Sequence, residues 1–163
     1  MKIYFSISIA GGEDPDLILA KDIVVMLKKS GHEVLSEHVV LSGRVQRQVF
    51  LENAASAGFD VKNTDFSALV RAVDTYWVDQ AEALIAVVNR ASFGVGMEIE
   101  RALLKPKLGL NKTFVLTLIR RDLFEKTSKM ITGIRDGSFQ LYKYSSALEA
   151  MSGVDAFLRK LTE

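Results

Sequence analysis

A nearly unbroken apolar segment, Glu82–Val88, is followed by the small-residue stretch Asn89–Gly96 and then by strong helix formers over Met97–Lys105. Apolar runs of this kind form strands that are buried on both faces of a parallel sheet. Pro106 ends the predicted helix. A strand, a loop and a helix in that order place the loop at the carboxyl edge of the sheet, where open α/β folds bind ligands. The sequence therefore predicts a ligand site over residues 89–98.

Two glycines and a glutamate give this predicted loop its chemical character. Gly94 and Gly96 let a ligand approach the backbone, and the start of the helix offers free N–H groups to an anion. Glu98 is expected in the first helical turn, where the helix dipole favours the ionised carboxylate. A carboxylate beside an anion-binding pocket indicates a nucleophile next to a nucleotide. Alternatively, Glu98 only complements the dipole, and the glycine pair alone matches neither the P-loop nor the dinucleotide fingerprint.

The rest of the chain alternates predicted strands with predicted helices. We expect one domain over residues 1–163, with an α/β fold: a three-layer, doubly wound domain of Rossmann or flavodoxin type and a five-stranded, mostly parallel sheet. Segment 41–64 has a weak pattern and is predicted to be a long loop or a helix with a mobile connection that could lie over the site. The predicted strands cover residues 2–9, 32–36, 82–88, 112–119 and 138–142, and the predicted helices residues 17–29, 65–81, 97–105 and 147–161.

Asp74 breaks the apolar stripe of the predicted helix 65–81. It lies four residues after Val70 and four before Val78, where the pattern requires an aliphatic side chain. A carboxylate on a buried face costs several kcal/mol unless it is hydrogen-bonded or its pKa rises, and such groups gather at active sites. The alternative is a cap or an ion-pair partner for a neighbouring element.

Composition excludes several classes of function. The formal net charge of +1 gives no electrostatic reason to expect nucleic-acid or membrane-surface binding. The chain has no cysteine, so it cannot form disulfides or thiolate metal sites. The start Met1–Phe5 enters a strand without a signal-peptide pattern, and no apolar run approaches the roughly 20 residues of a membrane span. We expect a cytoplasmic protein that needs no metal or other cofactor.

Several segments together resemble the nucleoside 2-deoxyribosyltransferase superfamily, and most closely its branch of 2'-deoxynucleoside 5'-phosphate N-hydrolases. The similarity runs in order along nearly the whole chain. The matching residues are Tyr4, Ser8, Gly11-Gly12, Ser36–Val39, Asp74, Trp77, Gln80-Ala81, Ser92–Ala102, Ser128–Gly133 and Asp136–Gln140. The most specific part of this similarity is the segment Gly-Val-Gly-Met-Glu at 94–98 together with Asp74, which lies 24 residues before Glu98.

The resemblance implies a role for each matching catalytic position. Glu98 matches the nucleophile that attacks the anomeric carbon, Asp74 the carboxylate that assists the leaving base, and Tyr4 the tyrosine that orients the nucleophile. His38 matches a histidine near the site. The matches to the 5'-phosphate pocket are Ser8, Gly11, Ser92, Gly94, Gly96 and Ser128. The resemblance also implies a homodimer with shared active sites, in which Ser128 comes from the other subunit.

These residue types suit cleavage of an N-glycosidic bond. One carboxylate stabilises or traps the sugar cation while an acid lets the base depart. Two arginines of the monophosphate-hydrolysing relatives are missing: Ala10 stands in place of the first, and the chain continues after the glycine pair with Glu13 and Asp14, without the second. The loss of these donors weakens the expected phosphate site. The first expectation is hydrolysis of 2'-deoxynucleoside 5'-monophosphates. The alternatives are a deoxyribosyltransferase that acts on unphosphorylated nucleosides and a non-catalytic nucleotide-binding module.

Overall fold

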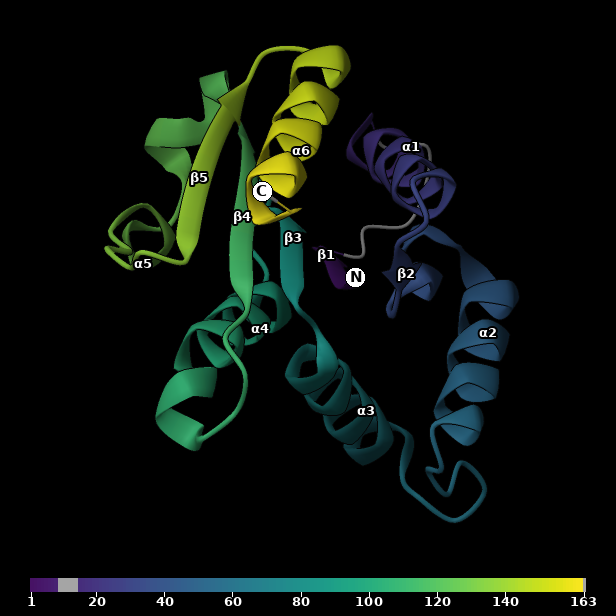
Figure 1. Cartoon of the computed structure of the whole chain (residues 1–163). Helices are drawn as coiled ribbons and strands as arrows, with labels where there is room; N and C mark the ends of the chain where they lie inside the picture. The colour runs from purple at the N-terminus through teal and green to yellow at the C-terminus, as the bar shows by residue number, and fades with distance from the viewer. Residues whose placement is uncertain (9–14, 163) are drawn as a thin grey trace.

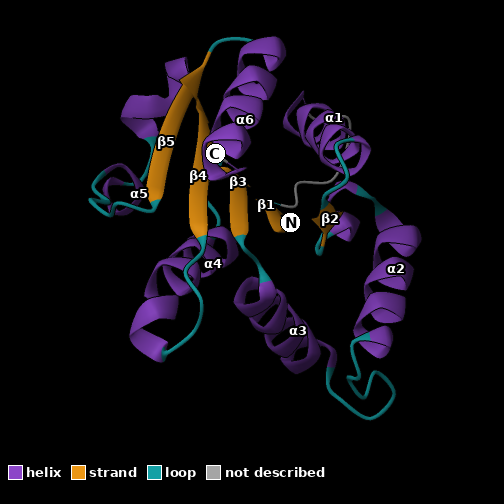
Figure 2. Cartoon of the chain, in the orientation of Figure 1, coloured by secondary structure: helices purple, strands orange, loops and turns teal. Residues whose placement is uncertain are grey.

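The computed structural model describes residues 1–8 and 15–162. Its core is a single sheet of five strands in the order β2-β1-β3-β4-β5, and every neighbouring pair is parallel (Figure 2). The strands are β1 (Lys2–Ile7), β2 (Glu33–Val34), β3 (Ala83–Val87), β4 (Phe114–Arg120) and β5 (Phe139–Tyr144). The structure confirms the predicted five-stranded α/β fold, and the described sheet is wholly parallel rather than mostly so.

Helices cover both faces of this sheet (Figure 1). We call the side that α1 and α6 cover the α1/α6 face and the side that α3 and α4 cover the α3/α4 face. The helices are α1 (Pro15–Lys29), α2 (Gly43–Ser56), α3 (Phe66–Gln80), α4 (Phe93–Leu104), α5 (Lys129–Thr132) and α6 (Ala147–Thr162), with short 3-10 turns at Glu37–Val40, Lys105–Leu108 and Arg121–Lys126. No helix in residues 1–8 and 15–162 is long and apolar enough to cross a bilayer.

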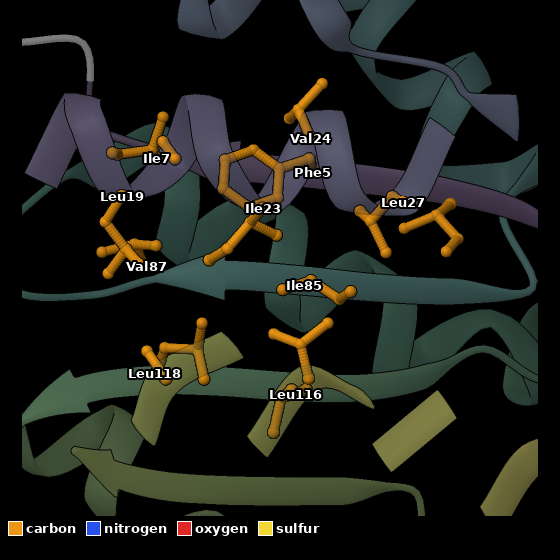
Figure 3. Packing of buried hydrophobic residues seen from close by; sticks show 14 of the residues in the cluster. Phe5, Ile7, Leu19, Ile23, Val24, Leu27, Ile85, Val87, Leu116 and Leu118 are labelled. Atoms are coloured by element: carbon orange, nitrogen blue, oxygen red, sulfur yellow. The ribbon is translucent and has the colours of Figure 1, made fainter. Parts of the chain in front are cut away.

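Alternation along the strands decides which side chains reach each face. On the α1/α6 face, Phe5, Ile85 and Leu116 lie side by side in register on β1, β3 and β4. Figure 3 shows this apolar layer against α1, with Ile23 and Leu27 of the helix pointing toward the strands. Because all five side chains are fully buried, this face is a dry apolar core.

Segment 41–64 contains α2, so the helical alternative of the prediction is correct. The sequence pattern was weak because α2 buries only Phe50 and Ala54, and the rest of the helix is partly or fully exposed. Gly58 follows the helix with φ of +91°, a left-handed conformation that glycine adopts without strain. The helix lies beside α3 rather than over the sheet centre (Figure 1).

Candidate active site

A cavity of about 570 Å³ opens on the α3/α4 face, beside the point between β1 and β3 where the strand order reverses. Ligands of open parallel sheets bind at such switch points. Its wall comes from β1, the turn at 37–40, α2, α3 and the start of α4. The lining residues are Tyr4, Ser6, Ile7, Ser8, His38, Val39, Gln46, Arg47, Phe50, Phe66, Val70, Asp74, Ser92, Gly94, Val95 and Glu98.

Two hydroxyls of β1 hold the Glu98 carboxylate. The Tyr4 hydroxyl donates to Oε1 of Glu98 at 2.9 Å, and the Ser6 hydroxyl donates to Oε2. Both side chains reach the α3/α4 face because residues two apart on a strand point the same way. Sequence reasoning singled out Tyr4 and missed Ser6, although this period of two was a signal for it.

Helix α4 begins earlier than the sequence predicted. It starts at Phe93, and the Ser92 side chain caps it by accepting a hydrogen bond from the Val95 N–H at 3.4 Å. Gly94 and Gly96 therefore belong to the helix and not to a loop, and Glu98 lies in the second turn, which corrects the expected first-turn position. The helix dipole acts mainly within the first turn. The hydroxyls of Tyr4 and Ser6 thus stabilise the carboxylate more directly than the dipole does.

Asp74 projects from α3 into the cavity opposite Glu98. Its helix is capped by Asp65 and buries Leu69, Val73, Trp77 and Val78, which places Asp74 at the edge of the apolar stripe. Its Oδ1 atom is buried without a hydrogen-bond partner. Burial raises the pKa of Asp74 to about 7, the Glu98 charge adds to this shift, and the Tyr4 hydroxyl opposes it. Near neutral pH, this carboxyl can both give and take a proton.

Burial also shifts the pKa values of Glu98 and Tyr4, and their neighbours modify each shift differently. Burial raises the pKa of Glu98, and hydrogen bonds from Ser6 and Tyr4 oppose this shift by stabilising the ionised form. Burial, followed by the charges of Glu98 and Asp74, raises the pKa of Tyr4 well above its usual value, so Tyr4 stays a donor. Two carboxyl groups in one pocket with different surroundings are able to take separate nucleophile and acid roles.

His38 lies in the turn at 37–40 and is buried between aromatic rings. Its ring centroid is 5.1 Å from that of Phe50 and 5.6 Å from that of Trp77. Burial lowers the pKa of His38 to about 4, and the Glu37 charge only partly opposes this. The imidazole is therefore neutral near pH 7, and its Nδ1 atom has no hydrogen-bond partner.

The structure brings most, but not all, of the predicted site residues together. Ser8, Ser92 and Gly94 line the cavity with the catalytic candidates, whereas Gly96 does not. Ser128 is exposed, away from the cavity wall, and caps α5 by accepting from the Met130 N–H at 3.3 Å. Gly11, like Ala10, lies outside the described residues. In the part of the chain that the structure describes, no group of three or more His, Cys, Asp or Glu side chains is arranged to hold a metal.

Four further lining residues that were not predicted from the sequence lie together on one wall of the cavity. Gln46, Arg47 and Phe50 come from α2, and Phe66 comes from the start of α3. Phe50 and Phe66 pack edge to face at 5.8 Å, and the Arg47 guanidinium lies 4.2 Å from the Phe66 centroid. The three positions on α2 were missed because segment 41–64 has a weak helical pattern, and Phe66 was missed because it lies at the start of its helix, outside the apolar stripe that singled out Asp74.

Two unequal carboxyl groups at the switch point of a parallel α/β sheet suit cleavage of an N-glycosidic bond, and comparison with known proteins supports the class of N-glycosidases. The chain is 34% identical over 143 residues to the 5-hydroxymethyl-dUMP N-hydrolase of Homo sapiens, covering 87% of this chain and 71% of that protein. It is also 34% identical over 155 residues to the 5-hydroxymethyl-dUMP N-hydrolase of Esox lucius, covering 94% and 92%. No family model matches the chain.

A solved structure has the same fold. It is the CMP N-glycosidase of Clostridium botulinum, with a TM-score of 0.57 and 12% identity over 96% of this chain and 99% of that one. At this identity the likeness concerns the fold alone. The sequence relatives are closer, and through them the chain belongs to the 2'-deoxynucleoside 5'-phosphate N-hydrolase family, which confirms the resemblance seen in its sequence.

Proposed function

We propose that the protein hydrolyses the N-glycosidic bond of 2'-deoxynucleoside 5'-monophosphates, releasing the free base and 2-deoxyribose 5-phosphate. The observation that carries this proposal is the pairing of Glu98, held by two hydroxyls, with Asp74, whose pKa is about 7, in one cavity. The names of the sequence relatives support the same substrate class.

The reaction proceeds in two steps. An oxygen of Glu98 attacks C1' of the sugar, the C1'–N bond breaks, and its electron pair leaves with the base, which takes a proton from Asp74. The resulting glycosyl ester splits one difficult displacement into two easier ones. Water then attacks C1' and gives its proton to Asp74, and the Glu98 carboxylate departs. Tyr4 and Ser6 stabilise Glu98 as an anion in both the free and the final state.

The 5'-phosphate is assigned to the end of the cavity beside the start of α4. Ser8 and Ser92 line this end, and free N–H groups of a helix start favour an anion. Ala10 removes one possible phosphate donor from the first loop. Two serine hydroxyls and the helix start of Phe93 remain to recognise the phosphate.

A homodimer with shared active sites is part of the proposal. Phe93, Met97 and Met130 are 96%, 51% and 82% exposed, although apolar side chains of this size are usually covered. Phe93 and Met97 lie on the helix that carries Glu98, and Met130 lies two residues after Ser128. A second copy that covers these side chains would bring its own Ser128 toward the phosphate end.

Light scattering should give a dimer for wild type and a monomer for Met130→Glu. The proposed substrate is a free nucleotide, which suits the cytoplasmic location expected from the sequence.

The first test is chromatography of the free base released from deoxynucleoside monophosphates, deoxynucleosides and ribonucleotides. We expect release from the deoxynucleoside monophosphates and a loss of at least about 10³-fold in Glu98→Ala, because the nucleophile is gone. Base exchange after addition of an acceptor base, without hydrolysis, would favour the transferase. Ala10 motivates this alternative, because it replaces an arginine that could bind the phosphate. Binding without turnover would favour the non-catalytic module.

A further inference from the structure

In the described part of the chain, three buried side-chain polar atoms lack a hydrogen-bond partner: Nδ1 of His38, Nε2 of Gln46 and Oδ1 of Asp74. All three residues line the same cavity. Burying a polar atom without a hydrogen-bond partner is unfavourable, so three such atoms in one cavity indicate groups that a ligand satisfies. The proposed mechanism uses Asp74 but gives no role to Gln46.

Helix α2 holds Gln46 in a fixed position. Phe50, one turn further along this helix, packs against the rings of His38 and Trp77 at 5.1 and 5.8 Å. Arg47 stacks on Phe66. These contacts fix the helix against α3 and the turn at 37–40, so the Gln46 side chain belongs to a packed wall of the cavity.

The position of this wall identifies the part of the nucleotide it meets. The sugar must lie against Glu98, and the phosphate lies at the end formed by Ser8 and Ser92. The base is left with the wall formed by α2 and α3, where Asp74 can protonate it and where Phe50 and Phe66 offer apolar surface to a flat ring. Gln46 is the residue of α2 on that wall whose amide donor is buried and unpaired.

The Nε2 atom of glutamine is a donor only, so its partner on the ligand must be an acceptor. We propose that Gln46 is a specificity-determining residue: its Nε2 donates to a ring carbonyl oxygen of the bound base and so favours oxo-substituted over amino-substituted bases. This inference rests on the proposed function. Asp74 performs the proton transfer, and Gln46 selects which base reaches it.

Two pairs of nucleotides isolate the group that Gln46 would recognise. The monophosphates of deoxyuridine and deoxycytidine differ at position 4 of the ring, oxo against amino, and those of deoxyinosine and deoxyadenosine differ in the same way at position 6. We would measure their kcat/KM for base release, and their affinity for Glu98→Ala by calorimetry, each with and without Gln46→Met. This change keeps the length of the side chain and removes the donor.

Wild type is expected to prefer the oxo member of at least one pair by about 10- to 100-fold, and Gln46→Met should reduce this ratio to about threefold or less. Gln46→Glu, which offers an acceptor in place of the donor, should turn the preference toward the amino member. The matched control is Gln48→Met on the same helix. Gln48 is exposed and donates to Glu52 at 2.9 Å, so the same change there should leave the ratio intact.

Equal losses for both members of each pair, or an unchanged ratio in Gln46→Met, would overturn the inference, as would a shift of the same size in Gln48→Met. Affinity measured in the Glu98→Ala background keeps this test separate from the proposed function. If wild type binds the nucleotides but releases no base, the proposed hydrolysis fails while the affinity ratio still decides the role of Gln46. If no member of the panel binds, both proposals fail.

Discussion

The two faces of the sheet differ in what the same three strands present to them. Phe5, Ile85 and Leu116 form a row of large apolar side chains on the α1/α6 face. One residue further along each strand, Ser6, Ala86 and Thr117 form a row on the α3/α4 face, where every side chain is small and two carry hydroxyls. Because both rows are attached to the same three strands, the backbone of these strands fixes the positions of both rows.

This difference assigns separate tasks to the two faces. The α1/α6 face excludes water and stabilises the fold through apolar burial. The α3/α4 face leaves room beside the strands, and the space is occupied by a cavity with Glu98 and Asp74 on facing helices. Changes in the apolar layer of the α1/α6 face should therefore affect stability with little effect on turnover, and changes to the polar side chains of the cavity should mainly affect turnover.

The largest effect is expected from Asp74→Asn on the α3/α4 face. The amide cannot protonate the leaving base, so kcat/KM should fall by about 10²- to 10⁴-fold. In wild type, the acid must be protonated, and because the pKa of Asp74 is about 7, kcat/KM should decline as pH rises above about 7. The variant should lack this alkaline decline. A pH–rate series on both proteins checks this, and full activity of Asp74→Asn at neutral pH would remove Asp74 from the mechanism.

A change on the opposite face should show the reverse behaviour. Leu116 is fully buried against the α1/α6 layer, and Leu116→Ala should lower the free energy of unfolding by about 2–5 kcal/mol through lost burial and a cavity. Urea denaturation measures this loss. The kcat/KM of the folded fraction should stay within about twofold of wild type, and a large loss of turnover would show that the two faces are not independent.

Ser6→Ala should have a smaller effect, confined to the chemistry. The Ser6 hydrogen bond lowers the pKa of Glu98 by stabilising the carboxylate, so its loss raises that pKa and leaves less ionised nucleophile at low pH. The acid limb of the kcat/KM profile should move to higher pH, and kcat should fall about tenfold. If the acid limb stays in place, the hydroxyl of Ser6 does not tune the nucleophile.

The smallest expected effect concerns the stability cost of Asp74. Its pKa is raised in the folded state from the ordinary value of 3.8 to about 7, so its favourable contribution is complete below about pH 4 and is lost as pH rises through about 7. Asp74→Asn should therefore match wild type in Tm at pH 4 and exceed it by on the order of a few degrees at pH 8. Calorimetric scans at both pH values test the sign, and a lower Tm for the variant at pH 8 would contradict it.

Sequence patterns predicted the parts of the molecule that local periodicity controls. The apolar runs located the strands, and the misplaced carboxylate in the stripe of α3 singled out Asp74. The start of α4 was misplaced because glycines at 94 and 96 indicate a loop, whereas the Ser92 cap and the packing of Val95 keep them helical. Ser6 could have been found, because it lies two residues after Tyr4 on the same strand. Gln46 could not, because its significance comes from what it faces across the fold, which no local pattern contains.

The support of Glu98 by β1 has a consequence for how activity arises during folding. The hydrogen bonds from Tyr4 and Ser6 reach across 94 and 92 residues of sequence. Contacts this distant form only after the intervening chain has closed, and such closures are slow relative to local helix formation. A partly folded chain can contain α3 and α4, with both carboxyl groups, and still lack the donors that keep Glu98 ionised. Recovery of turnover after dilution from denaturant should therefore follow docking of β1, later than recovery of helical circular dichroism.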